Sequence, residues 1–233
     1  MRHCLQSMIG YRIQATDGDL GKVNDFFFDD ETWTIRYMVA ETGSWLLERK
    51  VLVSLFALGK PQWESKAFLV NLTTLQIRNS PDIDTKRPVN RQHEIQLHEY
   101  YQWPYYWPGV SGGTFGITPQ PLFDTPLLQE PSVSDRHDNP HLRSIRQVVD
   151  YHIHATDGEI GHVEDFIVDD KNWALHHLVV DIGNWLPGRK VLISPKKIKS
   201  VNWADSSVYL NISRESVKNS PEFEPSRVIH RDF

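Results

Sequence analysis

The chain has 233 residues, of which 39% are hydrophobic and 24% charged, and its formal net charge is −5. This composition is typical of a globular protein, and the acidic balance argues against nucleic-acid binding, which usually needs a basic surface. The single cysteine, Cys4, excludes an intrachain disulfide. No signal peptide and no apolar run of membrane-spanning length is found, so we expect a cytoplasmic protein without a membrane span.

The chain contains an internal duplication. Residues 11–93 align without a gap with residues 151–233 at an offset of 140, and about a third of the aligned residues are identical. We call residues 1–107 the first half and residues 141–233 the second half. A repeat of this length indicates two copies of one structural unit rather than two copies of a short motif.

Each copy is expected to consist of short strands joined by tight turns. Alternating apolar and polar residues predict the strands, and Asp-Gly predicts a hairpin after the first of them. In chain order the expected strands are YRIQA, KVNDFFF, TIRYMVA and KVLVS in the first copy and YHIHA, HVEDFIV, ALHHLVV and KVLIS in the second, followed by a hairpin in WESKAFLVNL and in WADSSVYLNI. A short helical turn then closes each copy; the first has the capping-box form Thr73-x-x-Gln76, and Pro81 and Pro221 end the two turns.

Several residues recur in both copies and are interpreted as structural. We expect Asp17 and Asp157 to cap turns, Gly18 and Gly158 to occupy positive φ in the hairpins, and Trp33 and Trp173 to be buried. The pairs Trp45/Trp185 and Trp63/Trp203 are assigned to the same class, with Trp45 and Trp185 partly exposed in a glycine loop.

The repeated segments resemble the PRC-barrel family. The resemblance rests on ATDGxxGxVxDF, DDxxW, GxWLxxRKVL and the NSP that ends each copy, and it covers both copies. This family includes the cytoplasmic domain of the photosynthetic reaction centre H subunit and the C-terminal domain of the ribosome maturation factor RimM. The resemblance implies a small β-barrel that contacts other proteins and has no shared catalytic centre.

The expected architecture is therefore all-β. It comprises two tandem small PRC-type β-barrels, each ending in a short helical turn and joined by a linker rich in proline and aromatic residues. The expected domain bounds are 1–92, 93–140 and 141–233. We expect each barrel to fold independently, over about Leu5–Pro81 and Ile145–Pro221, and the two to pack as an intramolecular pseudo-dimer; a further homo-oligomer stays open.

The acidic and histidine residues that could bind a metal or act in catalysis also have structural interpretations. The repeated acids Asp25, Asp29 and Asp30 and their counterparts could form a carboxylate cluster, but their positions at predicted turns and strand ends favour capping. His176 and His177 replace Arg36 and Tyr37 of the first copy, and this exchange indicates a solvated face. Motifs of serine hydrolases, phosphate loops, zinc sites and dinucleotide binding do not occur. We therefore expect a non-enzymatic protein with no cofactor and no metal.

Two sets of residues are candidates for binding a partner protein. Arg49 and Arg189 recur before a strand and could hold a phosphate or an acidic partner, or pair with an acid of their own barrel. Residues 100–107, YYQWPYYW, carry six aromatic side chains in the linker, and we call them the aromatic segment. Disordered linkers are poor in aromatic residues. Trp103, Tyr105, Tyr106 and Trp107 therefore either pack on the barrels or face a partner.

Three functional hypotheses follow. The first is an adaptor or scaffold that binds proteins through two barrels. The second, suggested by the family name, is an accessory of a membrane electron-transfer or photosynthetic assembly. The third, which the missing motifs disfavour, is an enzyme or metal protein that uses scattered carboxylates and histidines.

Overall fold

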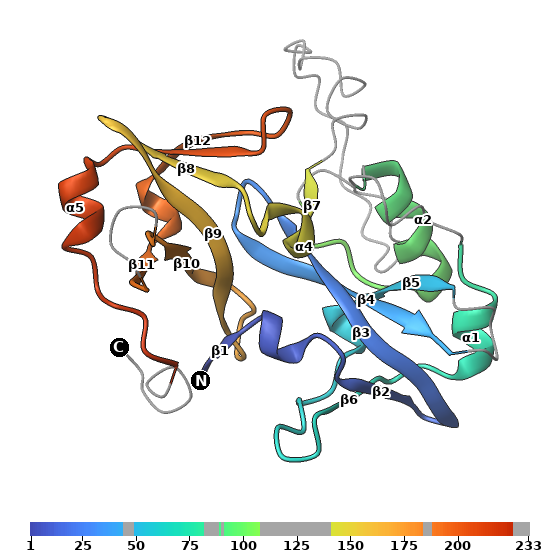
Figure 1. Ribbon diagram of the computed structural model, residues 1–233. Helices are drawn as coiled ribbons and strands as arrows, with labels where there is room; N and C mark the ends of the chain where they lie inside the picture. The colour runs from blue at the N-terminus through green and yellow to red at the C-terminus, as the bar shows by residue number, and fades with distance from the viewer. Residues whose placement is uncertain (44–48, 82–88, 90, 108–140, 184–187, 226–233) are drawn as a thin grey trace, which may run out of the picture.

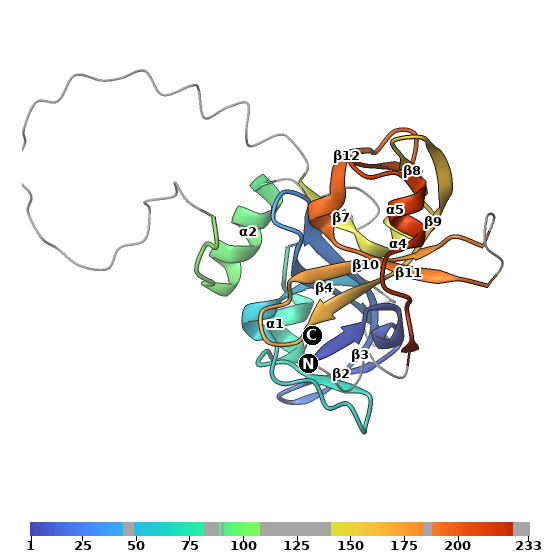
Figure 2. The same ribbon diagram turned by 90° about the vertical axis from the view of Figure 1, so that its left-hand side faces the viewer.

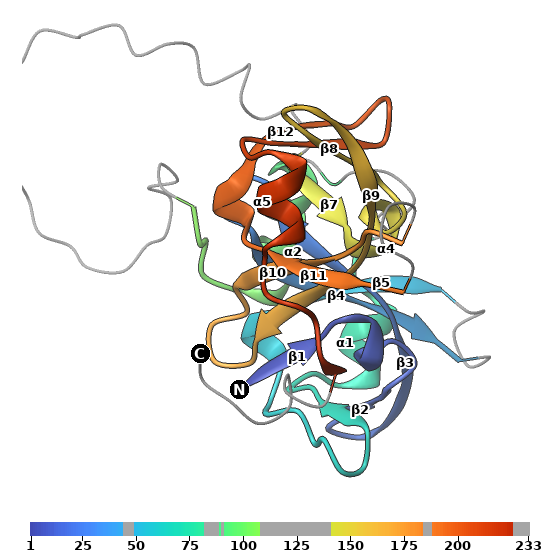
Figure 3. The same ribbon diagram turned by 60° about the vertical axis from the view of Figure 1, so that its left-hand side comes forward.

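The protein is described by a computed structural model that covers residues 1–43, 49–81, 89, 91–107, 141–183 and 188–225 (Figure 1). It is mostly β-structure with a few short helices. Within the described ranges, no helix is long and apolar enough to span a membrane. In Figures 2 and 3 the second half lies above the first.

The first half is built on a 6-stranded sheet in the order β5-β4-β3-β2-β6, with β7 paired to β3. The strands of the first half are β1 (Arg2–Cys4), β2 (Arg12–Ala15), β3 (Gly18–Asp29), β4 (Thr34–Thr42), β5 (Lys50–Ser54) and β6 (Ala67–Leu69). Its helices are η1 (Gln6–Met8), η3 (Leu55–Ala57), α1 (Thr74–Arg78) and α2 (Arg91–Tyr101). The capping box predicted for α1 is present, since Thr73 and Gln76 cap each other.

The second half repeats this pattern in a 7-stranded sheet, ordered β11-β10-β9-β8-β13-β12, with β1 paired to β9. Its strands are β7 (Leu142–Ser144), β8 (His152–Ala155), β9 (Gly158–Asp169), β10 (Leu175–Asp181), β11 (Lys190–Ile193), β12 (Ile198–Asn202) and β13 (Ser207–Leu210). Its helices are α4 (Ile145–Val148), η4 (Pro195–Lys197) and α5 (Arg214–Lys218).

The two halves exchange their first strands. β1 pairs with β9 of the second half, and β7, which stands 140 residues after β1, pairs with β3 of the first half (Figure 1). Short helical turns follow both exchanged strands, and each donates a backbone N–H to a buried aspartate of the opposite half: Gln6 to Asp165 at 3.0 Å and Arg146 to Asp25 at 3.2 Å. These aspartates anchor the exchanged strands instead of capping local turns.

Aromatic stacking reinforces the exchange. The His3 ring on β1 stacks on Trp63 with 3.6 Å between centroids, and the Arg143 guanidinium on β7 lies 4.2 Å from the Trp203 ring centroid. His3 and Arg143 are counterparts at the offset of 140, as are Trp63 and Trp203. Each exchanged strand therefore also contacts a half-buried tryptophan of the half from which it comes.

The inner faces of the two sheets share one hydrophobic core. A single cluster of buried side chains contains residues of both halves, among them Phe26, Phe28, Ile153 and Phe166. The Phe28 and Phe166 rings, from opposite halves, lie 6.1 Å apart. We call the opposite face of each sheet its outer face.

These findings correct two expectations. Among the described strands, neither sheet order returns to its first strand, so closed barrels are not formed; the inner faces close on each other instead. The two halves are also not independent, because the expected units starting at Leu5 and Ile145 omit the strands that they exchange. The domain bounds 1–92, 93–140 and 141–233 remain a prediction, and α2 runs across the first of them.

The glycines in the two hairpins have different roles from those expected. Gly158 has φ +136°, as predicted, but Gly18 lies outside the positive-φ region. The demanding positions are Gly21 and Gly161, where an added Cβ would stand 2.1 Å from the Glu41 carbonyl oxygen and closer still to that of Asp181. These two glycines therefore permit the close approach of neighbouring strands.

Candidate functional site

Helix α2 covers the outer face of the first sheet (Figure 2). Its Leu97 is 1% exposed and packs in a cluster with Tyr37, Val39 and Leu52. The helix is fixed to α1 as well, since the Tyr100 hydroxyl donates a hydrogen bond to the Gln76 carbonyl at 2.8 Å. The described part of the second half has no helix in the position of α2.

A buried carboxylate holds α2 to the sheet. Glu94 is fully buried, and its oxygens accept hydrogen bonds from the hydroxyls of Tyr37 at 2.9 Å and Tyr106 at 2.5 Å. Arg91 Nη1 donates to it at 2.9 Å, and His141 Nε2 lies 2.6 Å away. Burial of a charge is unfavourable unless it is paired and hydrogen-bonded. Glu94 satisfies both conditions and links the helix, the sheet, the aromatic segment and the start of the second half.

The electrostatics of this cluster keep its phenols protonated. Burial, and then the charge of Glu94, raise the pKa of Tyr37 and of Tyr106. Burial lowers the pKa of His98 in spite of the opposing charge of Glu94, so this ring is neutral at pH 7, and its Nε2 lies 2.8 Å from the Tyr37 hydroxyl. The cluster binds through hydrogen bonds and presents no activated nucleophile.

The aromatic segment packs against α2 and stays partly exposed. The chain turns at Gln102, which has φ 58°, and the Trp103 N–H donates to the His98 carbonyl at 2.9 Å. Each ring has several neighbours, and the main contacts are these: Trp103 stacks on Tyr101 (4.2 Å), Tyr105 stacks on His98 (5.5 Å), Arg36 lies over Tyr106 (4.0 Å) and Arg91 over Trp107 (4.2 Å). All four rings are half-buried. One part of each ring therefore packs against the protein, and another part is exposed to solvent.

The two arginine candidates lie at the ends of the glycine loops. Arg49 donates to the carbonyls of Arg78 at 3.1 Å and Ser80 at 2.8 Å, so it caps the end of α1. Arg189 is half-buried, and its Nε has no hydrogen-bond partner among the described residues. The structure thus gives Arg49 an intramolecular role, and it does not bring the two arginines together.

The repeated Asp residues of the hairpins form hydrogen bonds with residues that are distant in the sequence. Asp17 accepts from the Thr74 N–H at 2.8 Å and Asp157 from the Arg214 N–H at 2.7 Å, so each hairpin turn is joined to the first turn of the closing helix. Asp29 binds the N–H groups of Glu31 and Thr32, as predicted for a turn.

Trp33 and Trp173, which were expected to be buried, are half-buried at the place where the two halves meet. Both have positive φ, 52° and 58°, and both pack against the shared core. The Leu175 N–H donates to the Trp33 carbonyl at 2.8 Å, and the Ile35 N–H to the Trp173 carbonyl at 2.9 Å. Trp45 and Trp185 lie outside the described residues.

Sequence reasoning missed the residues beneath α2. Tyr37 was assigned to a solvated face because His177 replaces it in the second copy; this was wrong, since Tyr37 is fully buried. Glu94 and His98 lie beyond the last aligned pair of residues, so the duplication gave no information on them.

The fold defined by these observations is a mostly β arrangement of two related sheets. The family model for the PRC-barrel domain matches residues 143–217, which lie in the second half. A comparison with curated proteins found no match. Among the described residues, no group of three or more His, Cys, Asp or Glu side chains is arranged to hold a metal ion.

Proposed function

We propose that the protein is a non-enzymatic, cytoplasmic adaptor in which two PRC-type units form an intramolecular pseudo-dimer and bind another protein. The match at residues 143–217 favours an interaction module. The pairing of β1 with β9 and of β7 with β3 supports the extension of this assignment to the first half.

The observation that carries the proposal is the aromatic segment. Its Tyr106 is held in place by the fully buried Glu94, and Trp103 and Tyr105 keep part of their surface in solvent. Fixed, half-exposed Trp and Tyr side chains are the residue types enriched at binding hot spots. The segment is present once per chain, so it gives the pseudo-dimer one asymmetric binding surface.

The test is affinity capture from the cells that make the protein. We expect Tyr105→Ser to lose the bound protein while the melting temperature stays close to that of the wild type. The matched control is Tyr209→Ser, because Tyr209 also stacks on a histidine, His154 at 5.0 Å, and is 37% exposed, but lies in the second half. Equal capture by the Tyr105 and Tyr209 variants contradicts the proposal.

A further inference from the structure

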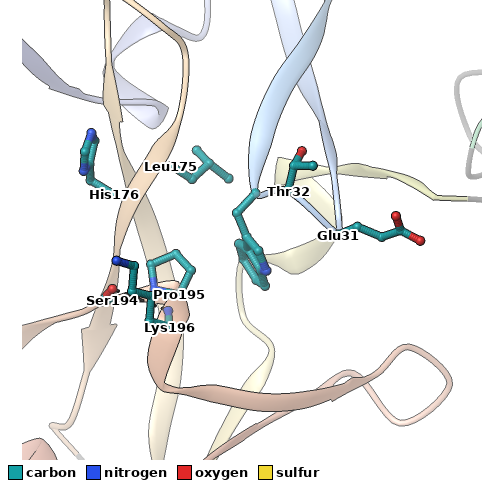
Figure 4. Close-up of a pocket in the computed structure, with 8 residues that line it drawn as sticks. Glu31, Thr32, Leu175, His176, Ser194, Pro195 and Lys196 are labelled. Atoms are coloured by element: carbon teal, nitrogen blue, oxygen red, sulfur yellow. Dashed lines mark hydrogen bonds between the residues drawn. The ribbon is translucent and has the colours of Figure 1, made fainter. Parts of the chain in front are cut away.

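A pocket of about 440 Å³ lies between the two halves, close to the Trp33–Leu175 backbone contact. Its walls come from the turn that follows β3, from the start of β10 and from η4 (Figure 4). The lining residues are Glu31, Thr32, Trp33, Leu175, His176, Ser194, Pro195 and Lys196. Its size is within the range of ligand-binding clefts.

The duplication identifies the counterpart of this pocket in the first half. His176 corresponds to Arg36, and each is the extra residue of a β-bulge, since Val168 and Ile167 pair with Leu175 and His177 as Phe28 and Phe27 pair with Ile35 and Tyr37. Bulges redirect side chains and recur beside functional sites. Lys196 corresponds in the same way to Phe56.

The counterpart surface is partly covered by the chain itself, although Phe56, the counterpart of Lys196, is 51% exposed. The Tyr106 ring lies over Arg36 at 4.0 Å, and His98 meets Phe56 with 6.4 Å between ring centroids. The covering residues, 94–107, combine a carboxylate with aromatic rings. In the second half His176 and His177 remain half-exposed and Lys196 is exposed.

The charges around the open pocket suit an acidic occupant. Lys196 supplies a positive charge to its lining, whereas burial, followed by the positive charge of Arg2, lowers the pKa of both His176 and His177, so these two rings offer neutral hydrogen-bonding groups at pH 7. The acidic groups nearby are Asp169, 3.8 Å from His176, and Glu31, whose side chain points away from Ser194 and Lys196 (Figure 4). In the first half, Glu94 accepts a hydrogen bond from the Tyr37 hydroxyl. In the second half, the corresponding donors for a carboxylate would be the His177 ring and Lys196.

We propose that this pocket and the adjoining His176–His177 surface bind an acidic, aromatic segment of a partner protein, as the first half binds residues 94–107 of its own chain. The inference rests on the proposed adaptor function and places a second contact on the opposite half. Residues 94–107 already occupy the first surface around Arg36, whereas the described surface around His176 and His177 is half-exposed and can receive a segment supplied by the partner.

The experiment uses the full chain and a labelled synthetic peptide with the sequence of residues 94–107. Fluorescence anisotropy at low salt measures binding, and NMR of the histidine ring protons locates it. We expect saturable binding, shifts at His176 and His177, and about tenfold weaker binding to Lys196→Glu. The matched control, Lys199→Glu, makes the same charge change at another exposed lysine of the second half and should bind within about twofold of the wild type.

Three outcomes overturn the inference. The first is equal binding to the Lys196 and Lys199 variants, and the second is shifts confined to His98 and His141, which would indicate exchange at the first sheet. The third is binding only to a chain shortened to Pro225, because residues 226–233 would then be the occupant. The Lys196 variant leaves the aromatic segment intact and Tyr105→Ser leaves the pocket intact, so this inference and the proposed function fail separately.

Discussion

Asp165 accepts the backbone N–H of Gln6, a residue 159 positions earlier in the chain, at 3.0 Å. Burial raises the pKa of Asp165 to about 6, although its hydrogen bonds from Gln6 and Phe166 oppose this shift. An aspartate in the unfolded chain has a pKa of about 3.9. The folded state therefore binds more protons than the unfolded state between about pH 4 and pH 6, and this residue makes the protein less stable as the pH rises through that window.

We predict that Asp165→Asn removes this pH dependence. The amide oxygen can still accept from Gln6 and Phe166, and the buried charge is gone. At pH 7 the variant should be more stable than the wild type, by up to about 2–3 kcal/mol, with the difference vanishing near pH 4. Urea unfolding at pH 4.5, 5.5 and 7 measures it, with the exposed Asp205→Asn as control. A constant difference across these pH values would show that Asp165 keeps an ordinary pKa.

Glycine substitutions should separate the two hairpin positions. Gly21→Ala places a Cβ about 2.1 Å from the Glu41 carbonyl oxygen at φ +135°, so we expect destabilisation of about 3 kcal/mol or more. Gly18→Ala, three residues earlier, meets only the Thr74 methyl group at 3.9 Å and should change stability by less than about 1 kcal/mol. Thermal unfolding measures both, and a tolerated Gly21→Ala would rule out the close strand contact.

Glu94→Gln should weaken the attachment of α2. It removes the charge that binds Arg91, two tyrosine hydroxyls and His141, and we expect a loss of about 2–4 kcal/mol in the free energy of unfolding. Glu99→Gln is the matched control, because Glu99 lies on the same helix and is exposed. If both variants unfold at the same urea concentration, Glu94 is not the anchor.

The strand exchange predicts that the halves need each other. Residues 1–107 and 141–233, produced as separate chains in one cell, should copurify as a folded heterodimer. Removing residues 1–4 from the first fragment takes away the strand β1 that pairs with β9 across the two halves and should weaken the complex, as measured by sedimentation. Two folded monomers with no association would show that the exchange is dispensable.

Alternating residues and turn signals were sufficient to predict most strands, and the Thr73-x-x-Gln76 pattern predicted the capping box of α1. The exchange of strands could not be predicted in this way, because the aligned repeat begins at Tyr11 and residues 2–4 share no identity with residues 142–144. Nothing local distinguishes a strand that pairs within its own half from one that pairs with the other. Among the site residues, the aromatic segment was visible by composition, whereas Glu94 acquires its role only through contacts with Tyr37 and His141, distant in the chain.

The exchanged strand β1 also bears on the timing of folding during synthesis. β1 pairs with β9 with Arg2 opposite Asp169 and Cys4 opposite Ile167. Because these strands are far apart in the sequence, β1 leaves the ribosome long before β9 is synthesised. At about 5–20 residues per second the delay is roughly 10–30 s. During that interval β1 is unpaired and the apolar inner face of the first sheet is exposed. Chaperones recognise such features, and neighbouring nascent chains on one polysome could pair through them. Folding of this protein is therefore completed late in translation. The yield of folded protein should depend on how well chaperones keep the nascent first half from aggregating until β9 is synthesised.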